Sequence, residues 1–159
     1  MQNQVQTLRR QYHYIQSSRG VLLDFCATIS TADLLRENSS FGRGSMRNLL
    51  VHMATTYEFW IGKYGLQLDV EFTDYDAVTT VEQLRAAFQR VDQWVAAFLA
   101  GMEAGRIQTV HFEFDGKPQE TEALKLFTHV ITHEFHHKGQ VLSFSRHLGY
   151  TPVDTDVLR

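Results

Sequence analysis

Apolar residues recur every three or four positions through most of the chain, which is the spacing that places them along one side of a helix. Four segments carry this pattern, at about 5–29, 45–64, 79–102 and 121–147. Only two prolines occur, and both lie outside these segments, where they interrupt no helical hydrogen bonding. The pattern therefore predicts four helices of about 20–27 residues that pack as an all-α, four-helix bundle.

Polar residues that favour helix ends mark several boundaries. The run Ser30–Asp33 is expected to end the first helix and to begin a short helical turn. Ser45 is the expected N-cap of the second helix. A polar connection over 67–79 follows, and Thr79 with Glu82 forms a capping-box pattern for the third helix.

One segment alternates as a strand does. Residues Thr109–Phe114 alternate in polarity, and Asp115 with Gly116 forms a hairpin turn signal. We expect a short β-hairpin or an extended connection here, before the last helix. Thr121 is expected to open that helix, and Gly149 to stop it.

Composition narrows the class of protein. A chain of 159 residues fits a single domain, 1–159, and a net charge of −3 argues against a nucleic-acid partner. No stretch approaches the ~20 apolar residues of a membrane span. The polar start lacks the apolar run of a signal peptide, and the single cysteine, Cys26, has no internal disulfide partner. We therefore expect a cytoplasmic protein in which Cys26 is a small core residue.

A histidine-rich segment carries the candidate chemistry. Residues 133–137 read His-Glu-Phe-His-His. On a helix, His133 and His137 project one turn apart from the same side, the spacing at which two imidazoles can hold one metal ion. A helical wheel places His137 in the apolar sector and His133 at its margin, with His129 and His136 towards solvent.

A third ligand is needed for a stable open site. His52 is the candidate, because it lies among apolar residues in the middle of the second helix. Facing helices of a bundle can deliver side chains to one central point. The alternative is that His52 is an ordinary hydrogen-bonded core histidine.

The string H-E-x-x-H also matches the zinc-protease signature. That signature needs a further ligand downstream, whereas Gln140 and Ser143 stand where the extended pattern has glycine and histidine. No glutamate follows Glu134. The sequence therefore argues against a protease, and the simplest role for Glu134 is a surface pair with Lys138 four residues on.

With His52 and the run 129–140, His-Val-Ile-Thr-His-Glu-Phe-His-His-Lys-Gly-Gln, the chain resembles the DinB/YfiT-like family over nearly its whole length. Its members pair a histidine on the second helix with a fourth helix ending in a His-His-Arg-Gly-Gln type sequence. The resemblance implies a four-helix bundle with one long crossover, often dimeric, and a divalent metal held by His52, His133 and His137. Lys138 departs from the family's arginine, and lysine lacks the planar fork for bidentate contacts.

The resemblance also implies a chemistry, since some relatives are thiol S-transferases that use low-molecular-weight thiols such as bacillithiol, mycothiol or glutathione. The leading hypothesis is a transferase in which zinc or nickel binds such a thiol as thiolate, which attacks a small-molecule electrophile. One alternative is a metal-dependent hydrolase that uses a metal-bound water, with Glu134 as a possible base. Another is a non-enzymatic metal-binding stress protein with a closed site, for which His13 or His129 would supply a fourth ligand. A homodimer is expected on the resemblance alone.

Overall fold

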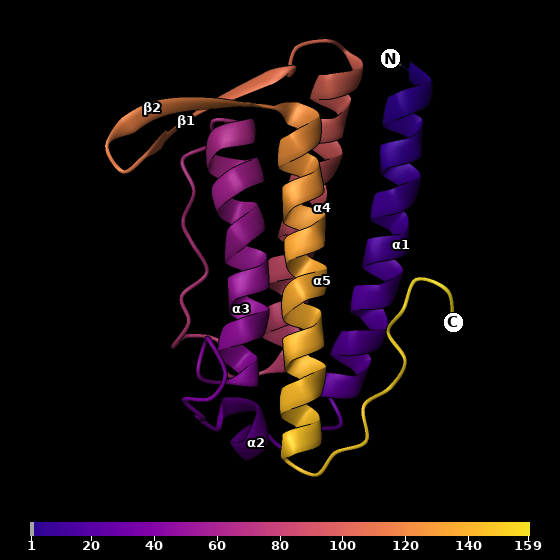
Figure 1. Cartoon of the computed structure of the whole chain (residues 1–159), viewed down its shortest axis with the longest axis vertical. Coiled ribbons are helices and arrows are strands. Elements are labelled where there is room, and N and C mark those ends of the chain that lie inside the picture. The colour runs from indigo at the N-terminus through magenta and orange to yellow at the C-terminus, as the bar shows by residue number, and fades with distance from the viewer. Residues whose placement is uncertain (1) are drawn as a thin grey trace.

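The computed structural model describes residues 2–159 as a bundle of long helices with one small hairpin (Figure 1). The helices are, in chain order, α1 (Gln2–Cys26), α2 (Thr31–Leu35), α3 (Met46–Tyr57), its continuation η1 (Glu58–Gly65), α4 (Val81–Glu103) and α5 (Ala123–His147). The all-α bundle predicted from the apolar spacing is therefore confirmed.

The helices do not simply alternate in direction. Followed by colour in Figure 1, α1 and α5 run one way along the bundle, and α3 and α4 run the other way. The connection over 66–80, which has no regular helix or strand, returns along the length of the bundle between α3 and α4. It is the one long crossover implied by the family resemblance.

The capping residue of α4 differs by one position from the prediction. Thr80, not Thr79, is the N-cap, and its hydroxyl accepts a hydrogen bond from Gln83 N at 3.3 Å. Gln83 Oε1 accepts in return from Thr80 N at 3.0 Å and also from Thr79 N at 2.8 Å. Gln83, rather than Glu82, completes the capping box, because a side-chain amide here reaches the backbone of both threonines.

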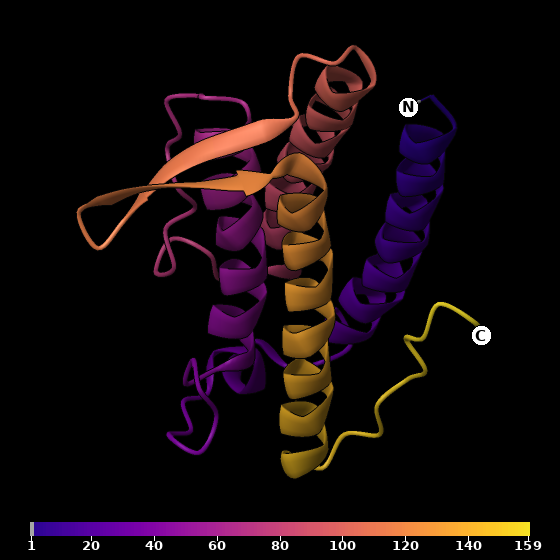
Figure 2. The ribbon, with the colours of Figure 1, turned by 45° about the horizontal axis from the view of Figure 1, so that its top comes forward.

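The predicted hairpin is present, formed by β1 (Thr109–Phe114) and β2 (Lys117–Glu122). Asp115 and Gly116 have φ angles of 51° and 69°, the left-handed pair that a tight two-residue turn requires. Thr121 is paired within β2, so α5 begins two residues later than predicted, at Ala123. Figure 2 shows the hairpin projecting sideways from one end of the bundle.

The second long helix changes its hydrogen bonding partway. The prediction of a helix from Ser45 to about Tyr64 is right in extent, but Glu58–Gly65 is π-helical. The buried carboxylate of Glu58 accepts hydrogen bonds from Thr73 N at 2.8 Å and from Arg90 Nη2 at 2.5 Å. These bonds hold the crossover against the π-helical segment, and π-helical turns are frequent at functional sites.

A polar layer divides the apolar core across its middle. Arg19 and Glu134, 3% and 2% exposed, form a two-pronged ion pair with both N–O distances at 2.9 Å. Tyr57 donates to Glu134 Oε2 at 2.7 Å, while Arg19 and Tyr12 both donate to Asp92 Oδ1, at 2.7 and 2.6 Å. This layer joins α1, α3, α4 and α5, with one apolar cluster on either side of it.

Two expectations from composition can be compared with the fold. In the range 2–159, no helix is both long and apolar enough to cross a bilayer. Cys26 is buried, and burial raises the pKa of its thiol to about 12. A thiol held in its protonated form within the apolar core is the small core residue that the sequence predicted.

Candidate metal centre

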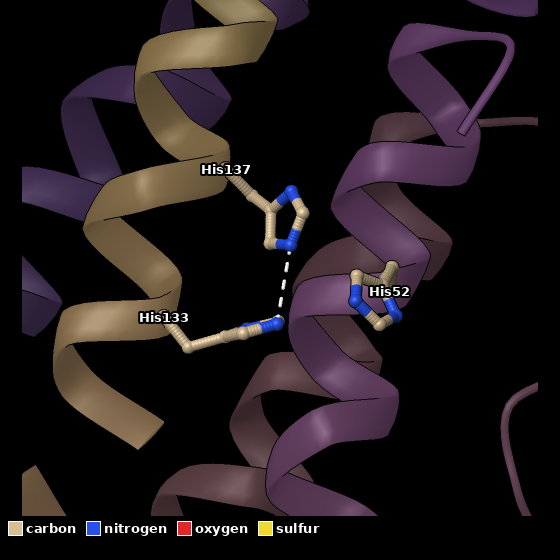
Figure 3. A group of neighbouring side chains, drawn as sticks. All are labelled: His52, His133 and His137. Carbon is tan, nitrogen blue, oxygen red and sulfur yellow. Dashed lines mark hydrogen bonds between the residues drawn. The ribbon is translucent and has the colours of Figure 1, made fainter. Parts of the chain in front are cut away.

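The three predicted histidines meet between α3 and α5 (Figure 3). His52 projects from α3 towards His133 and His137, which project from consecutive turns of α5. The candidate ligand nitrogens all lie within 4.8 Å of one another. The Nε2 atoms of His133 and His137 are 3.1 Å apart, the separation marked by the dashed line in Figure 3.

The helical pattern explains this convergence. His137 is buried on the same stripe of α5 as Val130 and Val141, and His133 is half-buried at the edge of that stripe, as the wheel predicted. His52 is half-buried on α3, and its ring centre lies 4.7 Å from that of His137. Two apolar stripes that pack against each other therefore bring the imidazoles together at their shared margin.

The spacing of His133 and His137 fits a shared metal ion. Two nitrogens that each lie about 2.0–2.1 Å from a tetrahedral zinc ion are separated by about 3.3 Å. The observed 3.1 Å between His133 Nε2 and His137 Nε2 is close to that value. Within residues 2–159, His133 Nδ1 is buried without a hydrogen-bond partner, so the histidine cluster provides the only polar contact of that ring.

Gln140 orients one of these rings, a role that sequence reasoning did not assign. Its Oε1 lies 2.8 Å from His137 Nδ1, and its Nε2 lies 3.2 Å from the exposed His136. An amide oxygen can only accept, so this contact places the proton of His137 on Nδ1 and leaves the Nε2 lone pair directed at the cluster. The spacing of three residues on one helix was the available signal.

The imidazoles are held in the form that binds metals. Burial, followed by the charges of neighbouring groups, lowers the pKa of His52 to about 4 and that of His133 to about 3. Burial also lowers the pKa of His137. All three rings are therefore neutral at pH 7, and a neutral imidazole is the state that offers a lone pair to a cation.

Glu134 does not join the histidines. It points into the polar layer, where both its oxygens accept hydrogen bonds from buried donors of α1 and α3. The predicted surface pair with Lys138 is also wrong, because both side chains are buried and neither is the other's partner. Glu134 pairs with the guanidinium of Arg19 instead. Arg19 lies in the apolar stripe of α1, between Ile15 and Leu22, and this position was the sequence signal that its charge meets a buried partner.

Lys138 instead holds the C-terminal segment. Its ammonium group donates to Ser18 Oγ at 2.8 Å and to the carbonyl oxygen of Thr155 at 2.6 Å. Figure 1 shows this segment returning along the bundle beside α1. Lysine in place of arginine thus makes two single contacts rather than a planar fork.

The other histidines lie outside the three-membered group. His136 is exposed, as the wheel predicted, and so is His13 on α1. His129 is exposed one turn before His133, with its ring centre 5.7 Å from that of His133. Of the two donors considered for a closed four-ligand site, only His129 is close to the group, and its nitrogens are not part of it.

A cleft of about 630 Å³ opens beside the histidines, within the usual range of roughly 300–1,000 Å³ for small-molecule sites. Arg43 Nη2 lies 2.9 Å from His52 Nε2, and the Tyr75 hydroxyl lies 3.4 Å from His52 Nδ1. The cleft is lined by residues of α3, η1, α5, the 36–45 loop and the crossover: Arg43, His52, Thr55, Thr56, Phe59, Trp60, Phe72, Thr73, Asp74, Tyr75, His129 and His133. A small molecule bound there would lie next to the cluster.

A four-helix bundle with three histidines gathered between two of its helices defines a class of protein able to hold a divalent metal ion. The model of the DinB family matches residues 1–159, and the chain belongs to that family. It is also similar to the uncharacterized protein YizA of Bacillus subtilis (strain 168), with 24% identity over 155 residues, 92% of this chain and 91% of that protein. The family resemblance noted in the sequence is confirmed.

Proposed function

We propose that this protein is a metal-dependent thiol S-transferase in which His52, His133 and His137 hold a divalent ion, zinc or nickel. The observation that carries the proposal is the group of three neutral imidazoles beside a cleft of small-molecule size. Imidazole suits both metals, and three such ligands leave room for a further one.

The chemistry divides between the ion and the chain. When bound, a divalent ion would lower the pKa of a coordinated low-molecular-weight thiol, so that the thiolate is available at neutral pH. The thiol gives its proton to solvent, its sulfur forms a bond to an electrophilic carbon, and the leaving group departs with its bonding electrons. The chain supplies the neutral ligands, the orientation of His137 by Gln140 and a cleft in which the acceptor is held near the sulfur.

The contacts of Glu134 favour transfer over hydrolysis with that residue as base. A general base needs a free lone pair near the water it activates. The carboxylate of Glu134 is instead bonded to Arg19 and Tyr57 in the polar layer. An open site is also supported over a closed structural one, because the group has three members among residues 2–159.

The proposal is tested by metal binding and turnover measured together. The wild-type protein should bind one divalent ion per chain in equilibrium dialysis and, once loaded, consume an activated aryl halide only when a thiol is added. His137→Ala should lose both properties. His111→Ala, which alters an exposed histidine of the hairpin, should keep both. Turnover that needs no thiol, or metal binding unchanged in His137→Ala, would contradict the proposal.

The same proposal includes a cytoplasmic location and a homodimer, which relatives of this kind often form. Light scattering coupled to size exclusion distinguishes the mass of one chain from that of two. A monomer at micromolar concentration would remove the dimer from the proposal and leave the metal chemistry unaffected.

A further inference from the structure

The cleft beside the histidines has aromatic walls. Phe59 and Trp60 of η1 pack edge to face with ring centres 5.1 Å apart, Phe72 of the crossover lies 6.3 Å from Phe59, and His129 lies 5.7 Å from Trp60. Phe72 is 42% exposed, although it is a large apolar side chain on a mostly polar connection. Aromatic walls of this kind favour a ligand with a flat ring, through stacked and edge-to-face contacts.

The polar side chains of the same cleft differ in how much of their hydrogen-bonding capacity is already used within the chain. The hydroxyls of Thr55 and Thr56 both donate to the carbonyl oxygen of His52, at 3.2 and 2.8 Å. Arg43 is the cleft's one lysine or arginine among residues 2–159, and its side chain, which carries five N–H donors, has one partner there, His52 Nε2 at 2.9 Å. Asp74 is the one acidic residue of the lining, and its Oδ1 accepts from a backbone N–H two residues on, at 2.9 Å.

We propose that this cleft binds an arene bearing an anionic group, with its ring against Phe59, Trp60 and Phe72 and its anion on Arg43. A guanidinium forms strong, directional hydrogen bonds with carboxylates and related anions. As a statement about the acceptor of the reaction, the inference rests on the proposed thiol transfer. It identifies that acceptor as an electrophilic aromatic acid.

The ligand class is tested by calorimetric titration of the metal-free protein with three matched probes. These are 1-naphthoate, which has both features, 1-naphthylmethanol, which lacks the charge, and cyclohexanecarboxylate, which lacks the flat ring. Loss of either contact should weaken binding about tenfold. Naphthoate should therefore bind about ten times more tightly than either other probe. Equal affinities for the three probes, or no measurable binding of naphthoate, would overturn the inference.

Matched variants assign the two contacts. Phe72→Ala should weaken naphthoate and naphthylmethanol alike, whereas Phe114→Ala, at an exposed phenylalanine of the hairpin, should change neither. Arg43→Gln should weaken naphthoate about tenfold and spare naphthylmethanol, and Arg36→Gln should affect neither probe. Asp74→Asn should strengthen naphthoate alone, because it removes a repelling charge. Effects equal to those of the matched controls would overturn the assignment.

The binding titrations and the turnover assay test separate claims. The titrations contain neither metal nor thiol, so failure of naphthoate to bind overturns the aromatic-anion subsite and leaves thiol transfer to its own turnover test. Naphthoate that binds as described to a protein without thiol-dependent turnover would overturn the transferase instead. Circular dichroism of each variant establishes that a lost affinity does not arise from a lost fold.

Discussion

Breaking the ion pair between Arg19 and Glu134 tests whether the glutamate of the H-E-x-x-H string has a structural role or acts as a base. Glu134→Gln keeps the shape of the side chain but removes its charge, and it can turn an N–H group towards the guanidinium. Removing one partner of a buried pair costs about 3–5 kcal/mol. Asp92 still accepts from Arg19 at 2.7 Å, so we expect a loss at or below the lower end of that range, about 2–4 kcal/mol.

In a chain of this size, such a loss lowers the melting temperature by roughly 5–15 °C. Urea unfolding followed by far-ultraviolet circular dichroism measures the free energy directly. Asp24→Asn is the matched control, because it breaks an exposed pair with Arg85 and should cost less than about 1 kcal/mol. Unchanged stability of Glu134→Gln, together with a loss of thiol-independent hydrolysis, would refute the structural role and identify Glu134 as a base.

Gln140→Leu removes the acceptor from a metal-facing imidazole and should weaken divalent-ion affinity about 10–100-fold in equilibrium dialysis, while equal affinity would contradict its orienting role. The pKa values of His52 and His133 in the folded chain, about 4 and about 3, lie below the ordinary 6.5. Between these pH values and 6.5, the unfolded metal-free chain therefore binds more protons than the folded one. Stability that is present above pH 6.5 should therefore be lost as the pH falls through 4 towards 3, and a melting temperature that rises on acidification would be inconsistent with this sign. Lys138→Met removes two hydrogen bonds of the C-terminal segment and should lower the unfolding free energy by about 1–3 kcal/mol and hasten proteolysis near Thr155, whereas unchanged cleavage kinetics would show that other contacts hold the segment.

Much of the fold could be predicted because local patterns and tertiary packing agree. Apolar spacing located the long helices, and the Asp115–Gly116 pair located the hairpin, since few other residues adopt two left-handed conformations in succession. The errors fall at boundaries. Thr80 replaces Thr79 as the cap, and Thr121 belongs to a strand, because several residues in each place have suitable chemistry and the surrounding contacts select one.

By itself the sequence determined which side of each helix is buried, and therefore that His52, His133 and His137 lie on or at the edge of the buried side. A helical period is a local property, and a residue's phase relative to its apolar neighbours can be counted along the chain. The family resemblance then indicated that His52 of one helix groups with His133 and His137 of another.

Only the tertiary structure decided which side chains meet across helices. Glu134 lies one residue from His133 yet joins Arg19, more than a hundred positions away, because a step of one residue on a helix turns the side chain by about 100° towards a different neighbour. The same applies to Arg43 and Phe72, which reach the cleft from a loop and from the crossover. Their positions depend on how nonperiodic segments are anchored, and a helical pattern carries no information about that anchoring.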